Sequence, residues 1–293
     1  MVEAALRAAP VLWTLHDMWA LGDGPSYFPE TELKHRWNLS PLRKLREARP
    51  EGCLTTLTPS VWLRDLVRSV DTGPCEAWPN PLDTTAFQPM DRESVRRSLG
   101  LGDEDILLMA AAENLADPRK GIDLLEEAWK QGIRGSRRVW LGLAGRNCPP
   151  SLRTDPQVVE FGSVASEQRM AQLMSAADLF LHPARVESYG LVLEEAQACG
   201  TPVVAFAGGG VEETFVDGTT GWRIENKSAY GIGNIVQGLL QDLPSLRKAR
   251  GACRAHMMKK HRHDTFAKSW HPFLAGCLDG KLKKRSAEPR PPL

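Results

Sequence analysis

Residues 177–206 read ADLFLHPARVESYGLVLEEAQACGTPVVAF, and this stretch decides the fold. An apolar run ends at Pro183, a helical pattern covers residues 190–199, and a β-branched run follows Pro202. Gly200 stands where the end of a helix favours a residue of positive φ, and Pro202 prevents the helix from continuing. The stretch therefore predicts a strand, a helix and a second strand, with a polar loop before the helix.

The chemistry is expected in that loop and in the first turns of the helix. Backbone N–H groups at a helix start lack acceptors within the helix, and with the helix dipole they favour an anion such as a diphosphate. These groups belong to Tyr189, Gly190 and Leu191. Glu187, just before the helix, could reach the group attached to the diphosphate. A glutamate further in could accept hydrogen bonds from two ribose hydroxyls, and periodicity does not choose between Glu194 and Glu195.

Length and composition indicate a globular protein without the excess of positive charge that is typical of nucleic-acid-binding proteins. The 293 residues suffice for two domains, or one and a half, and the formal net charge of +1 gives no bulk attraction to polyanions, so no nucleic-acid partner is expected. The six cysteines show no C-x-x-C spacing, and neither a membrane span nor a signal peptide is evident. These features predict a reduced, cytoplasmic protein, with the inner face of the membrane as the alternative location.

Strands and helices alternate from about residue 92 to about residue 262, which predicts a parallel sheet covered by helices on both faces. The expected strands are residues 106–112, 139–143, 158–161, 179–183 and 221–224, with helices at 121–131 and 167–176. No G-x-G-x-x-G follows any of these strands, so a dehydrogenase or nucleotide-sugar epimerase is not favoured.

The segment ESYGLVLEEAQACGTPVV, in which seven residues separate Glu187 from Glu195, resembles the signature of the retaining family 4 glycosyltransferases. Further segments resemble the same family in the same order: PVLWTLHDMW at 10–19, WPNPLDTTAFQP at 78–89, RKGIDLL at 119–125 and GGGVEE at 208–213. The resemblance spans about residues 10–278 and implies the GT-B fold, two doubly wound α/β domains facing each other across a cleft. The C-terminal domain would bind the nucleotide.

The resemblance also implies an organisation of this chain. Residues 1–82 would be a partial N-terminal Rossmann-like domain on the acceptor side, and residues 83–263 a complete nucleotide-sugar-binding domain with a doubly wound parallel sheet. A helix at 264–278 would pack back on the N-terminal domain, and residues 279–293 would form a disordered tail. Only about 80 residues precede the crossover, fewer than a complete N-terminal domain of the family contains.

Roles carried over by motif place Glu187 near the donor sugar and His16 in the cleft, as the candidate catalytic residues. The implied donor-binding set is Lys120, Arg119, Tyr189, Gly190, Leu191, Glu195, Gly209, Gly210 and Glu213. Cations and N–H dipoles would stabilise the charge that grows on the leaving diphosphate, so neither a metal nor another cofactor is expected. For His16, the alternative is a histidine that caps the strand. For Arg119 and Lys120 it is an ordinary pair of surface residues, and for the segment at 208–213 it is an ordinary glycine-rich turn.

Three positions depart from the family pattern. Pro81 replaces a glycine at the crossover, Glu113 and Asn114 stand where a glycine and an arginine are usual, and Glu212 replaces a proline. Two functions remain open. One is retaining transfer of a sugar from a nucleotide-sugar donor to a glycan or lipid-linked acceptor, in cell-surface or exopolysaccharide synthesis. The other is a truncated nucleotide-sugar-binding module without turnover.

Three other charged segments are predicted to lie on the solvent-exposed surface. Asp103 and Asp105 resemble a metal-binding D-x-D but precede a strand, at the wrong edge of a sheet for ligands. His261-x-His263 is expected to be exposed to solvent. A basic helix around residues 39–48 could support peripheral association with a membrane or a lipid-linked acceptor, but a solvated face is favoured. The basic residues of this helix are Arg43, Lys44 and Arg46, and Arg36 precedes it.

Overall fold

The computed structural model describes residues 9–22, 27, 32–48, 54–135, 138–262 and 270–276. The chain divides into two compact units. The first unit comprises Met1–Pro81, Glu187–Tyr189 and Arg262–Leu293, and the second comprises Leu82–Val186 and Gly190–His261. Each unit is described by itself.

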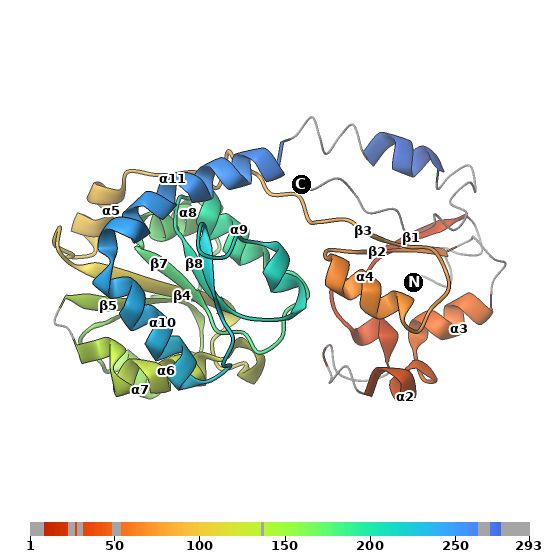
Figure 1. Ribbon diagram of the computed structural model, residues 1–293, viewed down its shortest axis with the longest axis horizontal. Coiled ribbons are helices and arrows are strands. Elements are labelled where there is room, and N and C mark those ends of the chain that lie inside the picture. Colours follow the sequence, from red (N-terminus) through yellow and green to blue (C-terminus); the bar gives the residue numbers. More distant parts are fainter. Residues whose placement is uncertain are drawn as a thin grey trace. The chain divides into compact units, whose positions relative to one another are not determined.

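The second unit is built on a parallel sheet of six strands in the order β6-β5-β4-β7-β8-β9. Figure 1 labels four of them, β4, β5, β7 and β8. The strands are β4 (Ile106–Asn114), β5 (Val139–Arg146), β6 (Val158–Gly162), β7 (Leu179–His182), β8 (Val203–Phe206) and β9 (Gly221–Ile224). The chain runs outward from β4 to β6 and then returns to place β7 beside β4, so the direction of winding reverses between β4 and β7. Ligands of open α/β sheets bind at the carboxyl ends of strands at such a switch point.

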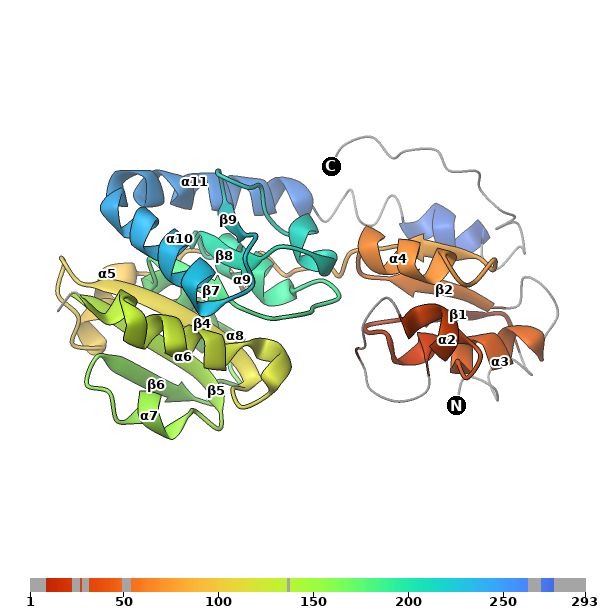
Figure 2. The same ribbon diagram turned by 60° about the horizontal axis from the view of Figure 1, so that its bottom comes forward.

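Helices cover both faces of this sheet, because successive side chains on each strand point to opposite sides (Figure 2). Leu107 and Met109 pack with helices α8 and α9, whereas Leu108 and Ala110 pack with α6 and α10. The helices and turns are α5 (Arg92–Ser98), η3 (Pro118–Lys120), α6 (Ile122–Gln131), η4 (Ile133–Gly135), α7 (Pro150–Arg153), α8 (Glu167–Ala176), α9 (Leu191–Ala198), η5 (Gly209–Glu213), α10 (Ala229–Gln241) and α11 (Leu243–Lys260). The predicted doubly wound sheet is confirmed.

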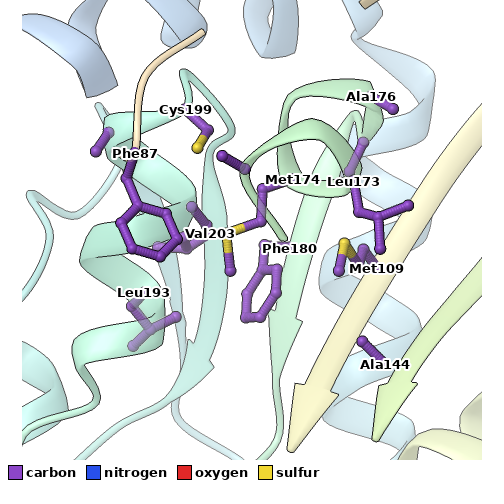
Figure 3. Close-up of a cluster of buried hydrophobic side chains, with 14 of the residues drawn as sticks. Phe87, Met109, Ala144, Leu173, Met174, Ala176, Phe180, Leu193, Cys199 and Val203 are labelled. Atoms are coloured by element: carbon purple, nitrogen blue, oxygen red, sulfur yellow. The ribbon is translucent and has the colours of Figure 1, made fainter. Parts of the chain in front are cut away.

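The core beneath α8 and α9 fixes where α9 starts. Phe180 of β7 and Val203 of β8 pack with Leu193 of α9 and Met174 of α8, and all four side chains are fully buried (Figure 3). Burying an aliphatic or aromatic side chain contributes about 1.5–3 kcal/mol. This packing holds the first turn of α9 at the carboxyl ends of β7 and β8.

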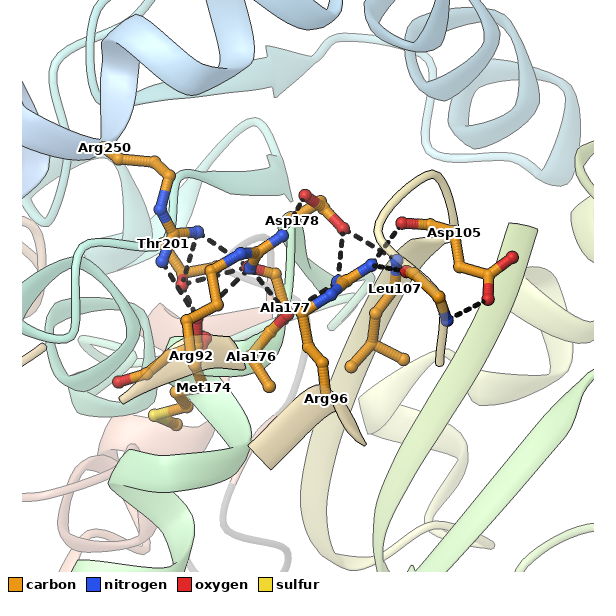
Figure 4. A network of polar contacts seen from close by, with 12 residues as sticks. Arg92, Arg96, Asp105, Leu107, Met174, Ala176, Ala177, Asp178, Thr201 and Arg250 are labelled. Atoms are coloured by element: carbon orange, nitrogen blue, oxygen red, sulfur yellow. Dashed lines mark hydrogen bonds and ion pairs between the residues drawn. The ribbon is translucent and has the colours of Figure 1, made fainter. Parts of the chain in front are cut away.

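The opposite, amino edge of the sheet carries a network of arginines (Figure 4). Asp178, just before β7, accepts from Arg92 at 2.5 Å and from Arg96 at 3.1 Å. Arg250 of α11 donates to the carbonyl of Ala177 at 2.7 Å, and desolvation lowers the pKa of its guanidinium to about 10. These cations satisfy carbonyls that the end of α8 leaves unpaired and complement its dipole. A cavity of about 460 Å³ adjoins the network, and no residue of the predicted donor site lines it.

The first unit contains a parallel sheet in the order β1-β2-β3. Its elements are β1 (Val11–Thr14), η1 (Trp19–Leu21), α2 (Leu33–Trp37), α3 (Pro41–Glu47), β2 (Leu54–Thr58), α4 (Val61–Arg68) and β3 (Cys75–Ala77). Helix α4 begins at Ser60, whose hydroxyl accepts from the N–H of Leu63, and it packs on β2 and β3. Within the described ranges, β1 pairs with β2 and with no other strand, so it is an edge strand.

The predicted basic helix is α3, and most of its cations are engaged within the first unit. In α3, Arg43 pairs with Glu47 at 2.7 Å and Arg46 with Asp71 at 2.9 Å; Arg36 of the preceding α2 pairs with Glu32 at 2.7 Å. Two of them are i,i+4 pairs on a helix surface, which is typical of a solvated face. The pairing therefore supports the solvated-face interpretation over a membrane-binding one.

Residues 270–276 form a helical turn in the first unit. The ring of Trp78 lies 4.8 Å from that of Trp270 and 5.0 Å from that of Phe273, measured between centroids. His263 and the tail at 279–293 lie outside the described residues.

Candidate functional site

The predicted donor-binding residues of the second unit follow three neighbouring strands. Lys120 lies in η3 after β4, Gly190 begins α9 after β7, and Gly209 begins η5 after β8. Because β7 pairs with both β4 and β8, the carboxyl ends of these strands adjoin one another. The fold therefore brings the three motifs to one edge of the sheet, at its switch point.

The turn that carries Lys120 is fixed against the loop after β7. Gly121 has a φ of 67°, and a Cβ at this position would lie 1.9 Å from the carbonyl oxygen of Pro183. Only glycine allows this close approach. The N–H of Arg185 also donates to the carbonyl of Arg119 at 2.8 Å.

The side chain of Arg185 strengthens this junction. Its guanidinium donates to both carboxylate oxygens of Asp123, at 2.8 and 2.6 Å, in a bidentate pair. The sequence did not indicate this pair, because the two residues lie 62 positions apart and no local pattern connects them.

Two basic residues near the carboxyl edge of the sheet differ from what the sequence predicted. Arg119 is exposed and donates to Asp117 of the same turn at 2.6 Å, a hydrogen bond that is the main cause of the lowered pKa of Asp117. Lys227, after β9, was not predicted, yet its ammonium donates to the carbonyl of Arg185 at 3.3 Å and lies beside Gly208. The stretch around Lys227 contains no pattern that could have indicated it.

Helix α9 offers backbone donors at its start. Gly190 precedes the helix with a φ of 88°, a left-handed conformation that favours glycine, and no side chain caps the helix. Across the described ranges, no acceptor bonds to the N–H groups of Gly190 and Leu191. An anion placed there would meet these N–H groups and the positive end of the helix dipole.

The two adjacent glutamates of α9 have opposite environments. The carboxylate of Glu194 is 0% exposed and bonds to the ammonium of Lys260 at 2.7 Å and to the ring of His261 at 2.9 Å. Burial opposes ionisation of Glu194, but the His261 hydrogen bond and the Lys260 charge outweigh it, so its pKa is lowered. The expectation that His261 is exposed to solvent is wrong, because its side chain is only 6% exposed against Glu194.

Glu195 is half-buried, and its carboxylate has no hydrogen-bond or ion-pair partner in the described part of the chain. Burial, followed by the negative charges of Glu167 and Glu194, raises the pKa of Glu195 to about 7. A carboxylate held partly out of water without a partner costs stability, and such groups are typical of binding sites.

The glycine-rich turn η5 is held at both ends. The N–H of Gly208 donates to the carboxylate of Glu212 at 2.8 Å, and the carbonyl of Glu213 accepts from Lys260 at 2.5 Å. Gly209 has a φ of 74°, which again favours glycine, and Gly210 is buried. Glu212, which stands where the family has a proline, therefore shapes the turn.

The two candidate catalytic residues, His16 and Glu187, belong to the first unit. The hydroxyl of Ser188 donates to the carbonyl of His16 at 2.5 Å, and the hydroxyl of Tyr27 donates to the carboxylate of Glu187 at 3.4 Å. Burial and the charge of Glu187 raise the pKa of Tyr27 to about 12. Tyr27 was not predicted, because it lies in a proline- and glycine-rich loop without periodicity.

Possible metal ligands are not grouped in the part of the chain that the structure describes: no three His, Cys, Asp or Glu side chains are placed to hold an ion. Asp103 lies in an exposed turn before β4, and Asp105 accepts from the N–H of Gly102 at 2.6 Å, as expected of a solvated turn. No helix of the described residues is long and apolar enough to cross a membrane.

Comparison with known proteins shows which family this chain resembles. Residues 105–242 match the family described as glycosyl transferases group 1. A GDP-mannose-dependent monoacylated alpha-(1-6)-phosphatidylinositol monomannoside mannosyltransferase from Corynebacterium glutamicum is 33% identical over 240 residues. That match covers 75% of this chain, and the chain spans only 62% of the length of that relative. Residues 105–242 therefore belong to the group 1 glycosyl transferase family.

Solved structures show the same fold. The crystal structure of Anabaena HepE with UDP and glucose matches 91% of this chain and 71% of its own, with a TM-score of 0.72 and 21% identity. The C-terminal domain of a group 1 glycosyltransferase from Francisella tularensis matches 61% of this chain and 97% of its own, with a TM-score of 0.51 and 20% identity. The second unit is thus a GT-B-like C-terminal domain, preceded by the small three-stranded parallel sheet.

Proposed function

We propose that the carboxyl edge of the six-stranded sheet binds the nucleoside diphosphate of a nucleotide sugar. The N–H groups of Gly190 and Leu191, with the ammonium of Lys120, would hold the diphosphate. Glu195 would accept hydrogen bonds from two ribose hydroxyls. The observation that carries the proposal is the half-buried carboxylate of Glu195, which has no partner among the described residues and a pKa raised to about 7. Glu194 is already engaged by Lys260 and His261, which supports Glu195 over Glu194 as the ribose acceptor.

The rest of the predicted donor set has supporting roles in this proposal. The backbone of η5, with Gly209, Gly210 and Glu213, would lie against the donor. Tyr189 is buried and would present its backbone at the start of α9. Arg119 has the least support as a donor-binding residue, because its guanidinium already bonds to Asp117.

The proposed reaction is retaining transfer of a hexose to a glycan or lipid-linked acceptor, as in cell-surface polysaccharide synthesis. When the bond between the sugar and the diphosphate breaks, negative charge grows on the diphosphate. Lys120 and the start of α9 would stabilise that charge without reorganising. Glu187, three residues before Gly190, would contact the donor sugar, and His16 would lie near it. The name of the Corynebacterium relative, with its GDP-mannose donor and lipid acceptor, supports this class of reaction.

Binding without turnover is the second candidate. It is favoured by the described strands of the first unit, which form a sheet of three with β1 at its edge. A complete acceptor site requires a well-packed framework around it, because catalytic geometry tolerates displacements of only about 0.5 Å.

The full chain should be tested with UDP- and GDP-hexoses, with binding followed by calorimetry and reaction by release of nucleoside diphosphate. Binding together with release, both reduced in Glu195→Gln, is the expected outcome. Glu187→Gln should bind nucleotide as the wild type does but release less product. Binding without release at any donor would support the second candidate. Absence of binding to every nucleotide would refute both.

A further inference from the structure

A buried ionic cluster lies beside the proposed ribose acceptor. Glu194, with no exposed surface, holds Lys260 at 2.7 Å through one carboxylate oxygen and His261 at 2.9 Å through the other. The two partners come from the C-terminal end of α11, and their side chains are only 9% and 6% exposed. Separating one member of such a cluster from the others would leave a buried charge without a partner, which is strongly destabilising. The three side chains are therefore held in one arrangement.

Lys260 extends this cluster to a third element. Its ammonium also donates to the carbonyl of Glu213, the last residue of η5, at 2.5 Å. A single side chain therefore connects α9, which follows β7, to η5, which follows β8. Both elements belong to the proposed donor site, whereas α11 itself contributes none of the predicted donor-binding residues.

We propose that Glu194, Lys260 and His261 are positioning residues that orient α9 and η5 toward the nucleotide sugar; this inference rests on the proposed function. Consecutive residues on a helix project about 100° apart. A clamp on the side chain of Glu194 therefore fixes the rotation of α9 about its axis. That rotation sets the direction in which Glu195 points.

Charge couples the same residues. Glu194 is one of the causes that raise the pKa of Glu195, after burial and the charge of Glu167 on α8. The charged or titratable groups that face Glu194 are Lys260 and His261, and His256 of α11 also feels its charge. Replacing Glu194 by glutamine should thus have two effects. The clamp is lost, and Glu195 ionises at lower pH.

The test is the affinity of the full chain for UDP and GDP between pH 5.5 and 8.5, measured for Glu194→Gln and wild type. At pH 8 we expect the dissociation constant of the variant to rise by about 10-fold, since small misplacements of binding groups have effects of this size or larger. The pH at which affinity is half lost should move lower than in the wild type. That second change reports the loss of the Glu194 charge. The weaker binding at pH 8, where Glu195 is ionised in both proteins, reports the loss of the clamp.

Two further variants separate positioning from loss of stability. Leu246→Ala removes a buried side chain of α11 that lines the cavity at the opposite edge, so it should lower the melting temperature and leave the dissociation constant unchanged. Lys260→Met should weaken nucleotide binding, whereas Lys260→Arg, which retains the charge, should restore most of it. These lysine variants also serve if Glu194→Gln does not fold.

The outcomes distinguish this inference from the proposed function. If the wild type binds no nucleotide, the proposed function fails. If the wild type binds and Glu194→Gln and Lys260→Met bind equally well at every pH, the positioning role is refuted. Equal loss of affinity in Leu246→Ala would also refute it, because the effect would then follow stability alone.

Discussion

Replacing Glu195 by glutamine should stabilise the protein and at the same time impair nucleotide binding. The folded state raises the pKa of this carboxyl from 4.5 to about 7. Each pKa unit corresponds to about 1.4 kcal/mol, so ionised Glu195 opposes folding by roughly 3 kcal/mol at pH 8. Glutamine has a similar shape and no charge, so it removes this cost.

The sign of the pH dependence follows from the raised pKa. Below about pH 4.5 Glu195 is protonated in both the folded and unfolded states, and the two proteins should be equally stable. As the pH rises from 4.5 to about 7, the unfolded chain releases its proton first, and the wild type loses stability that Glu195→Gln retains. Urea denaturation at a series of pH values measures the difference in the free energy of unfolding directly.

Binding should change in the opposite direction. If only ionised Glu195 accepts the ribose hydroxyls, wild-type affinity should fall about 10-fold from pH 8 to pH 6, because the competent fraction falls by that factor. Glu195→Gln should bind nucleotide weakly and without the pH dependence that Glu195 causes. Any pH dependence left in this variant comes from protonation of the ligand phosphates and is subtracted from that of the wild type. Glu167→Gln is the matched control, since removal of its charge should move the wild-type midpoint to lower pH. Equal stability curves and equal affinities for wild type and Glu195→Gln would refute the reasoning.

Four further predictions concern the same edge of the sheet. Lys120→Met should weaken binding of a nucleoside diphosphate by about 1.5–3 kcal/mol, yet leave binding of the nucleoside unchanged in calorimetry. Gly190→Ala should cost about 1–2 kcal/mol of stability and also weaken nucleotide binding, because its φ is 88°; Gly233→Ala, in open space on α10, should leave binding unchanged. Glu187→Gln should lower turnover at saturating donor while the nucleotide dissociation constant stays within twofold, roughly the range of a surface substitution. Nucleoside diphosphates should bind as well with EDTA as without it, and loss of binding in the chelator would count against the site.

The fold of the second unit could be predicted because its signals are local. The buried strand before Pro183, the helix that ends near Gly200 and the strand after Pro202 are each set by short-range patterns. The parallel order of the strands then follows from the alternation of strands and helices. The predicted strand at 106–112 proved to extend to Asn114, where a bulge shifts its register with β5. Such irregularities have no signal in the sequence.

The site could be predicted only in part, for the same physical reason. Lys120 and Gly190 stand in motifs that short-range chemistry explains. The proposed choice of Glu195 over Glu194 rests on the partners of Glu194, and Lys260 and His261 lie more than 60 positions away along the chain. His261 looked solvent-exposed because its neighbours in the sequence are basic, and only the folded structure places it against a buried carboxylate.

Hydrogen exchange of the full chain, with and without UDP or GDP, tests the central claim most directly, because the proposed site and the arginine-lined cavity lie at opposite edges of one sheet. We predict that nucleotide slows exchange in residues 118–125, 188–196 and 208–214 and leaves 92–105 and 243–250 unchanged. Protection confined to 92–105 and 243–250 would contradict it.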